Sequence, residues 1–388
     1  MNIRNQKTIQ GRRHNLEKEL HVDLTHIGSF TFDEVAASSR NCENMIGAAQ
    51  IPLGIAGPLL IKSMNDERRT ATNYYIPLAT TEGALVASVA RGCKAISESG
   101  GATVNSFRLG ATRGPVFHTT GYRENLKLFK FIQNNLPLFQ SIASATSHHL
   151  ILTEAISRIV GRYQFVRFAF NTQDAMGMNM VTIATEKVAR YIEEKTGAVC
   201  LSISGNYCVD KKPSWQNFIR GRGFEVWAEV LLPKYSLRET LKTTAKQLYN
   251  IWLSKCMIGS AVSGSIGYNA QYANIIAALY LATGQDAAHV TEGSLGITTA
   301  EAQGDDLYIS IYLPDLMVGT VGGGTGLATQ KEALMILKVD GGNGGANSQK
   351  FAEIIGAAVL AGEISLLASL AEGTLARAHK TLGRGMEK

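Results

Sequence analysis

Residues 165–203 constrain the fold more than any other segment, because the spacing of their apolar residues changes twice. Apolar side chains alternate in F-V-R-F-A-F, which predicts a half-buried strand. The apolar residues that come next follow helical spacing up to Gly197, and A-V-C-L-S-I-S then predicts a second strand. The order strand, loop, helix, strand therefore indicates a unit that combines helices with a sheet.

The rest of the chain divides into segments of different composition. Its 388 residues exceed the usual size of one hydrophobic core, so two or three domains are expected. Residues 1–42 are charged and weakly helical, whereas glycines and prolines punctuate the chain from Glu43 onward. Residues 80–99 predict a helix of small and apolar residues that ends at Gly100. A helical segment therefore precedes the larger domains.

Charge and cysteine content exclude several classes of protein. The chain has 38 basic and 32 acidic residues, and this net charge of +6 is too dispersed for a nucleic-acid surface but suits an anionic small molecule. Its five cysteines show no C-x-x-C spacing, so neither a disulfide framework nor a zinc site is predicted. No apolar run reaches the roughly 18 residues of a membrane span. We expect a soluble cytoplasmic protein with no metal, membrane or nucleic-acid partner.

The run S-G-N-Y-C-V-D-K-K-P at residues 204–213 places Lys211 and Lys212 beside Asp210, just after a predicted strand. Adjacent lysines can hold negative charge, either on a bound carboxylate or on an oxygen that becomes charged during a reaction. The alternative is a solvated charged turn, which is the commoner origin of such a cluster. The run alone leaves both interpretations open.

The loop D-A-M-G-M-N-M at residues 174–180 links a predicted strand to a predicted helix. Free N–H groups and the positive end of the helix can hold a phosphate or a ribose there. Neither this loop nor the glycine-rich segment at residues 319–326 has the G-x-G-x-x-G spacing of a Rossmann fold. Three methionines in seven residues can equally be filler of a core.

Four further polar residues have a structural interpretation, and two of them, Glu82 and His379, also have a chemical one. Glu82 would either cap the predicted helix or, if buried, donate a proton. Asp286 can cap a following helix, and Asn274 can be a satisfied polar residue of the core. His379, in the C-terminal helical region, is either structural or a general acid for a leaving thiolate.

Ten ordered segments between Glu43 and His379 together resemble the 3-hydroxy-3-methylglutaryl-CoA (HMG-CoA) reductase family. They are E-N-M-I-G, P-L-G-I-A-G-P-L, T-T-E-G-A-L-V-A-S, R-G-C-K-A-I, T-R-G-P-V, D-A-M-G-M-N-M, S-G-N-Y-C-V-D-K-K-P, G-S-A-V-S-G-S-I-G, A-T-G-Q-D-A-A and V-G-T-V-G-G-G-T. The T-T-E-G and E-N-M-I-G forms resemble the first of the family's two classes.

The resemblance implies a four-electron reduction of HMG-CoA to mevalonate and CoA by two hydride transfers from NADPH, through mevaldyl-CoA and mevaldehyde. The matching positions imply that Lys211 stabilises the oxyanion, that Glu82 supplies a proton and that Asp286 lies between them and tunes both. His379 would protonate the departing CoA thiolate.

The resemblance also implies binding roles for residues spread along the chain. Those for the substrate are Arg113, Ser204, Asn206, Asp210, Lys212, Lys255 and Asn274, with Ser88 and Arg91 near the CoA end. Those for the dinucleotide are Asp174, Met176, Gly177, Met178 and Asn179. Its 2'-phosphate would meet Ser147 and His148, where an arginine is frequent in the family, so NADPH is expected and NADH is the alternative.

The fold implied by the resemblance is α+β. A large helix-rich α/β domain, residues 43–113 and 215–388, would bind the substrate, and a small ferredoxin-like, non-Rossmann domain, residues 114–203, would be inserted in it to bind the dinucleotide. Residues 1–42 would be a short helical segment, and residues 204–214 the connecting loop of the active site. The family's active site forms between two subunits, so a homodimer or a dimer of dimers is expected.

Three alternative functions fit some of the same residues. Oxidation of mevalonate with NAD would use the same site, and the weakly basic residues 147–149 motivate it. A CoA thioester hydrolase or acyltransferase would use Cys208 as nucleophile and His379 as base, although Cys208 is more simply a buried small hydrophobe. A catalytically inactive CoA-binding protein is the third, and the complete catalytic set argues against it.

Overall fold

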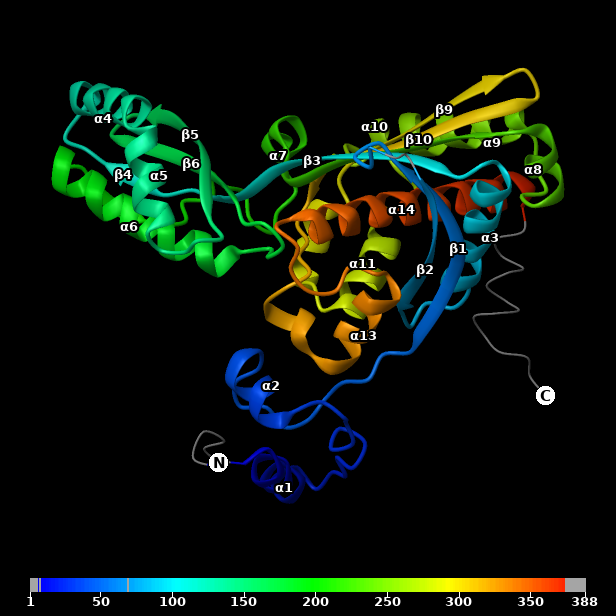
Figure 1. The fold of residues 1–388 in the computed structure, drawn as a ribbon, viewed down its shortest axis with the longest axis horizontal. Coiled ribbons are helices and arrows are strands. Elements are labelled where there is room, and N and C mark those ends of the chain that lie inside the picture. Colours follow the sequence, from blue (N-terminus) through cyan, green and yellow to red (C-terminus); the bar gives the residue numbers. More distant parts are fainter. Residues whose placement is uncertain (1–5, 7, 68–69, 374–388) are drawn as a thin grey trace.

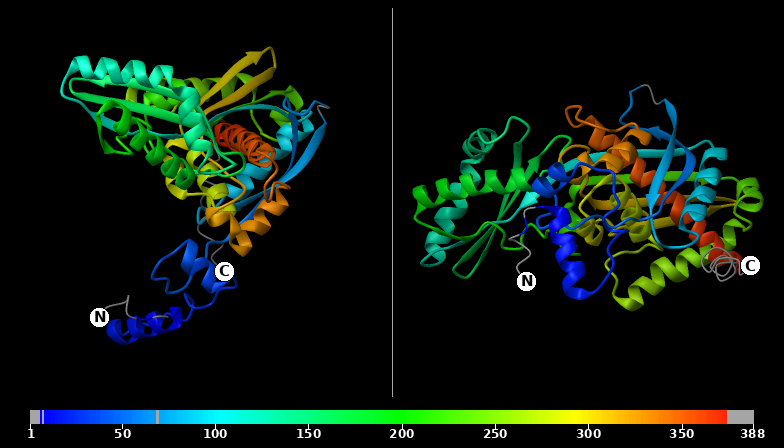
Figure 2. Two further views of the ribbon diagram at one scale, coloured as in Figure 1. Left: turned by 60° about the vertical axis from the view of Figure 1, so that its left-hand side comes forward. Right: turned by 90° about the horizontal axis from the view of Figure 1, so that it is seen from below.

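The computed structural model describes residues 6, 8–67 and 70–373. It has a large lobe, a small lobe to one side, and an N-terminal segment below them (Figure 1). A second view shows the N-terminal segment protruding from the large lobe (Figure 2). His379, the expected general acid, lies outside the described residues.

The small lobe is a four-stranded antiparallel sheet with helices packed on it. Its elements are β4 (Val116–His118), α4 (Tyr122–Asn134), α5 (Leu136–Ser144), β5 (Ile151–Val160), β6 (Tyr163–Asn171), α6 (Met178–Thr196) and β7 (Val199–Ser202). The strand order β7-β4-β6-β5 gives the β-α-β-β-α-β arrangement of ferredoxin-like folds. The expected non-Rossmann topology is therefore confirmed, and β6, α6 and β7 match the unit predicted at residues 165–203.

The large lobe is built on a sheet with the order β2-β1-β3-β8-β10-β9, in which only β1 and β3 run parallel. Its strands are β1 (Leu53–Ser63), β2 (Ala71–Ala79), β3 (Ala102–Arg113), β8 (Arg222–Leu232), β9 (Ile297–Gln303) and β10 (Asp306–Leu316). Residues 111–113, at the end of β3, pair with β6 of the small lobe. One strand therefore belongs to both sheets and holds the lobes together near Arg113.

Helix α14 (Ala346–Glu372) runs through the large lobe and packs against α3 (Leu85–Glu98) (Figure 1). It is long and apolar enough to cross a membrane, but 83% of its most apolar window is buried inside the protein, as in a core helix. Gly92 lets the two helices approach, because a Cβ there would lie 1.9 Å from the carbonyl oxygen of Ala361. The glycine of R-G-C-K-A-I therefore has a packing role.

The predicted helix at residues 80–99 begins later than expected. Ala84 adopts a left-handed φ of 73°, which an α-helix does not accommodate, and α3 starts only at Leu85. Glu82 therefore lies in the turn before α3 rather than in its first turn.

The remaining elements complete the large lobe and the N-terminal segment. Those of the large lobe are α7 (Trp215–Arg220), α8 (Lys234–Glu239), α9 (Ala245–Trp252), the π-helix η2 (Leu253–Gly259), α10 (Ser260–Ser263), α11 (Tyr272–Thr283), the 3-10 helices η3 (Ala287–His289) and η4 (Gly323–Gly326), α12 (Val290–Gly293) and α13 (Ala328–Ile336). The N-terminal segment has α1 (Ile9–Leu20) and α2 (Glu34–Arg40), as its helical periodicity predicts. Arg12 Nε donates to the carbonyl oxygen of Met45 at 2.8 Å and fastens α1 to the chain that follows.

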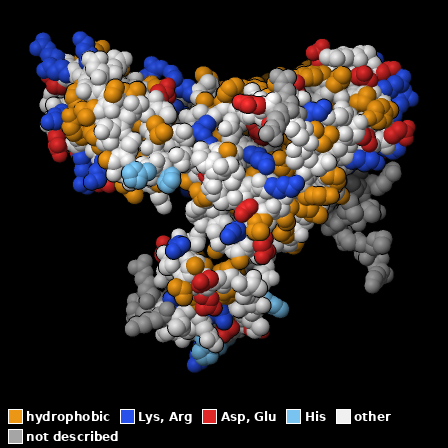
Figure 3. Space-filling view, viewed as in Figure 1, with side chains coloured by type: hydrophobic (Ala, Val, Ile, Leu, Met, Phe, Trp, Pro, Cys, Tyr) orange, Lys and Arg blue, Asp and Glu red, His pale blue; other side chains and the backbone are white. Residues whose placement is uncertain are grey.

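Acidic and basic side chains are intermixed over the face of the molecule drawn in Figure 3. No single-sign stripe crosses this face among the described residues. The picture agrees with the small, dispersed net charge of the sequence.

Candidate active site

The loop between β7 and α7, which we call the Lys211 loop, holds three residues in the left-handed region of φ. Asn206, Val209 and Lys211 have φ values of 61°, 46° and 57°, and each such conformation costs about 1–3 kcal/mol for a residue with a Cβ. Two buried side chains keep the loop in this shape. Asn217 Nδ2 donates to the Val209 carbonyl at 2.8 Å, and the Lys211 N–H donates to Glu292 Oε1 at 3.1 Å. Lys211 is therefore held in one direction.

Lys211 forms an ion pair with Asp286, whose Oδ2 lies 2.6 Å from Lys211 Nζ. The other oxygen of Asp286 caps η3 by accepting the N–H of Ala288 at 3.0 Å. Partial burial alone would raise the pKa of Asp286, but the hydrogen bonds from Lys211 and Ala288 outweigh it, so its pKa lies below the ordinary value. Asp286 is thus both the helix cap that the sequence suggests and the partner of Lys211.

Arg222 is the fully buried centre of a polar network beneath this loop. Its guanidinium donates to Asp210 Oδ1 at 2.7 Å, to Glu292 Oε1 at 2.7 Å and to Thr112 Oγ1 at 2.9 Å. It also reaches the sulfur of Met178, at the start of α6, at 3.2 Å. One side chain therefore joins the Lys211 loop, the shared strand β3, helix α12 and the small lobe.

Asp210 lies between two arginines. Besides Arg222, Arg113 Nη1 lies 3.7 Å from Asp210 Oδ2, and Arg113 Nη2 donates to Thr182 on α6 at 2.6 Å. Arg113 and Asp210, both expected to bind the substrate, are thus brought together and connected to the small lobe.

Asp210, His289 and Glu292 offer ligand atoms within 4.8 Å of one another, which is a possible arrangement for a metal ion. However, the Arg222 guanidinium donates to both carboxylates of this set. Arg222 therefore already supplies the positive charge that a metal ion would bring.

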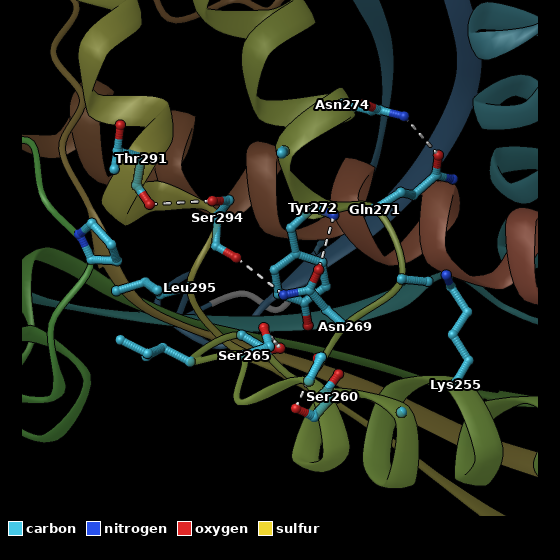
Figure 4. A pocket seen from close by; sticks show the side chains of 17 residues that line it. Lys255, Ser260, Ser265, Asn269, Gln271, Tyr272, Asn274, Thr291, Ser294 and Leu295 are labelled. Carbon is cyan, nitrogen blue, oxygen red and sulfur yellow. Dashed lines mark hydrogen bonds between the residues drawn. The ribbon is translucent and has the colours of Figure 1, made fainter.

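A cavity of about 770 Å³ opens beside the Lys211 loop and is lined by Pro213. Figure 4 shows Lys255 on η2 and Asn274 on α11 at one side of this cavity. Asn274 Nδ2 donates to Gln271 Oε1 at 3.5 Å and to Glu82 Oε1 at 3.4 Å. The structure therefore brings Lys255, Asn274 and Glu82 to the same region.

Glu82 contacts Asn274 and Thr80. Its side chain meets Asn274, and its backbone N–H donates to Thr80 Oγ1 at 3.0 Å. Within the described residues no hydrogen bond or ion pair joins Glu82 to Asp286. Asp286 is thus hydrogen-bonded to Lys211, and its expected place between Lys211 and Glu82 stays a prediction.

Glu363, buried in the middle of α14, holds the beginning of α11. Its carboxylate accepts the N–H groups of Ala270 at 2.9 Å and Gln271 at 2.6 Å, and the hydroxyl of Thr298 at 2.6 Å. Burial raises the pKa of Glu363 despite these hydrogen bonds. This carboxylate fixes the turn from which Asn274 reaches the cavity.

A second cavity, of about 580 Å³, lies between the small lobe and the glycine-rich loop at residues 319–324. It is lined from the small lobe by Met176, Gly177, Met178 and Asn179, and from the large lobe by residues that include Asp286. Gly319 allows the close approach, because a Cβ there would lie 2.3 Å from the Met176 nitrogen. The positive end of the 19-residue helix α6 also borders this cavity. An anionic dinucleotide fits these surroundings.

Asp174 is buried away from this cavity. Its carboxylate accepts the N–H groups of Asn343, Gly345 and Ser348, at 2.5, 2.7 and 2.9 Å. Burial would raise the pKa of Asp174, but these backbone hydrogen bonds together keep it below the ordinary value. Asp174 is the first residue of the loop at residues 174–180, which we call the cofactor loop. It therefore holds the start of this loop against the segment that precedes α14.

Two pairs of expected binding residues lie away from both cavities. Ser147 and His148 are in the turn between α5 and β5, and neither lines the second cavity. Ser88 and Arg91, on α3, contact α14: the Ser88 hydroxyl and Arg91 Nε each lie 3.0 Å from Ser365 Oγ.

The remaining loop residues have local contacts. Ser204 Oγ lies 3.9 Å from Cys208 Sγ, and Cys208 is fully buried. Lys212 is exposed, and its Nζ donates to the Asp210 carbonyl at 3.3 Å. The burial of Cys208 matches a small core residue better than a nucleophile.

The sequence interpretation missed three features of the site: Arg222, Glu363 and the glycine-rich wall at residues 319–324. The interruption of an apolar helix by Glu363 was a signal, since a carboxylate in a core requires partners. The glycines at residues 319–326 were noticed, but their spacing matched no known phosphate loop. A single arginine at the start of a strand carries no such signal.

Comparisons with known proteins cover nearly the whole chain. A family model described as "Hydroxymethylglutaryl-coenzyme A reductase" matches residues 8–384. The 3-hydroxy-3-methylglutaryl-coenzyme A reductase of Methanocaldococcus jannaschii is 51% identical over 380 residues, which are 96% of this chain and 92% of the relative. That of Pyrococcus abyssi is 50% identical, with 96% and 92% covered, and reductase 2 of Dictyostelium discoideum is 43% identical, with 94% and 69% covered.

A solved structure shares the fold. The class II 3-hydroxy-3-methylglutaryl-CoA reductase from Streptococcus pneumoniae, bound to NADPH in open conformations, is similar with a TM-score of 0.68. The match covers 95% of this chain and 99% of that one at 19% identity, so it supports the arrangement of the lobes alone.

Proposed function

This chain belongs to the hydroxymethylglutaryl-coenzyme A reductase family, and we propose that Lys211 and Asp286 form the centre of its active site. It reduces HMG-CoA to mevalonate and CoA with NADPH, in the mevalonate pathway. The main support for this proposal is that residues at or near the ion pair line two different cavities. Asp286 lines the cavity of the cofactor loop, whereas Pro213, two positions after Lys211, lines the other.

We assign roles to Lys211, Asp286 and Glu82 from the charge that each side chain can place near the reacting oxygen. NADPH, when bound, supplies the hydride for each reduction. Lys211 is a fixed cation beside the point where negative charge develops on the carbonyl oxygen. The pKa of Asp286 lies below its ordinary value because the hydrogen bonds from Lys211 and Ala288 outweigh burial, so Asp286 is an anionic partner that directs Lys211. Glu82, near Asn274, supplies a proton to the oxygen at the aldehyde stage.

The substrate carboxylate is assigned to Lys212 and Lys255, two exposed cations near the first cavity. Arg113, Asp210, Ser204, Asn206 and Asn274 shape or orient this region. The roles of Ser88 and Arg91 toward CoA, and of His379 toward the leaving thiolate, rest on the family resemblance.

The dinucleotide is assigned to the second cavity, with the inserted small lobe as its main binding domain. The N–H groups at the start of α6 and the close glycine-rich wall support binding of a phosphate there. The contribution of Ser147 and His148 to recognition of the 2'-phosphate stays a prediction, as does the absence of a metal.

Two copies of the chain are proposed to associate and complete the site. Large apolar side chains near the first cavity support this, because Ile258 and Val262 are 54% and 84% exposed. A cytoplasmic location and the first class of the family also stay predictions.

The function is tested by incubating the protein with HMG-CoA and either NADPH or NADH and measuring mevalonate by mass spectrometry. Mevalonate should form with NADPH, and light scattering should show a dimer or a larger assembly. Failure to form mevalonate with either cofactor would contradict the proposal.

A further inference from the structure

His289 is fully buried and is the last residue of η3, the short helix that Asp286 caps. Its Nδ1 lies 2.5 Å from Glu292 Oε1. Its Nε2 has no hydrogen-bond partner among the residues that the structure describes, and it lies 3.8 Å from Asp286 Oδ2 and 3.9 Å from Asp210 Oδ1. A buried ring nitrogen is therefore directed between two carboxylates of the proposed site.

The surroundings of Glu292 indicate which atoms of the ring carry protons. Glu292 Oε1 accepts the N–H of Lys211 at 3.1 Å and Arg222 Nη1 at 2.7 Å, in addition to facing His289 Nδ1. An oxygen that accepts this many hydrogen bonds acts as a carboxylate oxygen, so Nδ1 must be the donor to it.

The charges around Nε2 indicate that this nitrogen of His289 carries a proton as well. A lone pair on Nε2 would face the negative oxygens of Asp210 and Asp286, whereas a proton there would be attracted by both. Arg222 pairs with Asp210 and Glu292, Arg113 lies 3.7 Å from Asp210, and Lys211 pairs with Asp286, so cations also face these carboxylates. The atoms that face Nε2 are nevertheless carboxylate oxygens, and the described residues place no donor within hydrogen-bond distance of it. The geometry therefore favours a ring that carries both protons.

We propose that His289 is a positioning residue for the reduction. Its Nδ1 donates to Glu292, which accepts the Lys211 N–H, and its Nε2 lies 3.8 Å from Asp286 Oδ2, so a proton on Nε2 would attract the same oxygen that pairs with the Lys211 ammonium group. His289 and Lys211 face the same oxygen of Asp286, so that oxygen is held from two directions. The assignment deepens the proposed function and rests on it.

The first test measures the protons directly and does not depend on turnover. In protein labelled with ¹⁵N-histidine, the His289 resonances are assigned by their loss in His289→Gln. Both ring nitrogens should show the shifts of protonated nitrogens at neutral pH. A ring protonated on one nitrogen only would overturn the proposal, whether or not the protein makes mevalonate.

The second test separates positioning from packing by kinetics. His289→Leu keeps the bulk but no donor, and kcat should fall by about tenfold or more, whereas KM for HMG-CoA and for NADPH changes little. His289→Gln keeps one donor and should recover part of kcat. The matched control is His118→Gln on β4, whose ring stacks edge-on against Tyr163 in the small lobe and should leave kcat unchanged.

The outcomes of the second test are decisive in either direction. A kcat for His289→Leu equal to that of the wild type would overturn the proposal. If His289→Leu does not fold, the comparison of His289→Gln with His118→Gln decides. Equal kcat values in those two variants would then overturn the proposal, and a lower kcat at unchanged melting temperature in His289→Gln would support it.

Discussion

Lys211 Nζ and Asp286 Oδ2 lie 2.6 Å apart although the two residues belong to distant segments of the chain. Lys211 stands on a loop returning from the small lobe, and Asp286 begins a short helix of the large lobe. The pair is 41% and 39% exposed, so substrate and cofactor can reach it. The proposed mechanism depends on this charge pair, of which Asp286 lines the second cavity while Pro213, two positions after Lys211, lines the first.

Asp286→Asn should lower kcat strongly, because the neutral amide cannot form the ion pair that directs Lys211. Loss of one group that stabilises developing charge typically lowers kcat by about 10²–10³. KM should change little. The matched control is Asp305→Asn, which alters an equally short pair with Lys234 on the exposed surface. Similar kcat values for the two variants would refute the role of Asp286.

Asp174→Asn should loosen the loop before α14 and weaken NADPH binding. Three backbone N–H groups would lose a charged acceptor, at a cost of about 1–3 kcal/mol in the free energy of unfolding. Urea denaturation and KM for NADPH measure the two effects. Asp23→Asn, in an exposed turn of the N-terminal segment, is the control. An unchanged free energy of unfolding would show that Asp174 is not a structural acceptor.

Asp315→Asn should reduce the dependence of stability on pH. Burial raises the pKa of Asp315 well above its ordinary 3.8, so the folded protein keeps a proton that the unfolded chain releases. Wild-type stability should therefore fall as the pH rises above that ordinary value. Urea unfolding at pH 5 and pH 8 should show a smaller decrease in Asp315→Asn. The exposed Asp340→Asn should behave as the wild type, and an equal decrease in all three proteins would count against the burial argument.

Cys208→Ser should retain reductase activity, because Cys208 is a fully buried residue of the loop between β7 and α7 rather than a nucleophile. A modest loss of stability is expected, since a hydroxyl replaces a buried thiol. A thioester hydrolase would instead lose all activity in this variant while Lys211→Ala stayed active. Mevalonate formation and release of free thiol from HMG-CoA without NADPH distinguish the two functions.

The sequence predicted the elements of the small lobe well, because the spacing of apolar residues within each element depends only on nearby residues. Alternation in β6 and the helical spacing of α6 reflect which faces are buried, and both elements form where expected. The start of α3 was placed too early, because the left-handed conformation of Ala84 is imposed by its surroundings. Local patterns therefore predicted the elements but not all their boundaries.

The site was predicted in part for a similar reason. Motifs identified Lys211 and Asp286 as chemical groups, but their distance depends on how the lobes meet. The network around Arg222 was not foreseen, because its partners come from β3, the Lys211 loop and α12. The hydrogen bonds of Asp174 to the start of α14 were also not foreseen, because Gly345 and Ser348 are distant from it in the sequence.

The most direct measurement follows NADPH oxidation and mevalonate formation from HMG-CoA in the wild type, Lys211→Ala and Lys212→Ala. The wild type should consume two NADPH per mevalonate, and Lys211→Ala should lose hydride transfer while still binding HMG-CoA. Lys212→Ala should chiefly raise KM for HMG-CoA. Equal losses of kcat with unchanged substrate affinity in both variants, or full activity of Lys211→Ala, would contradict the central place of Lys211.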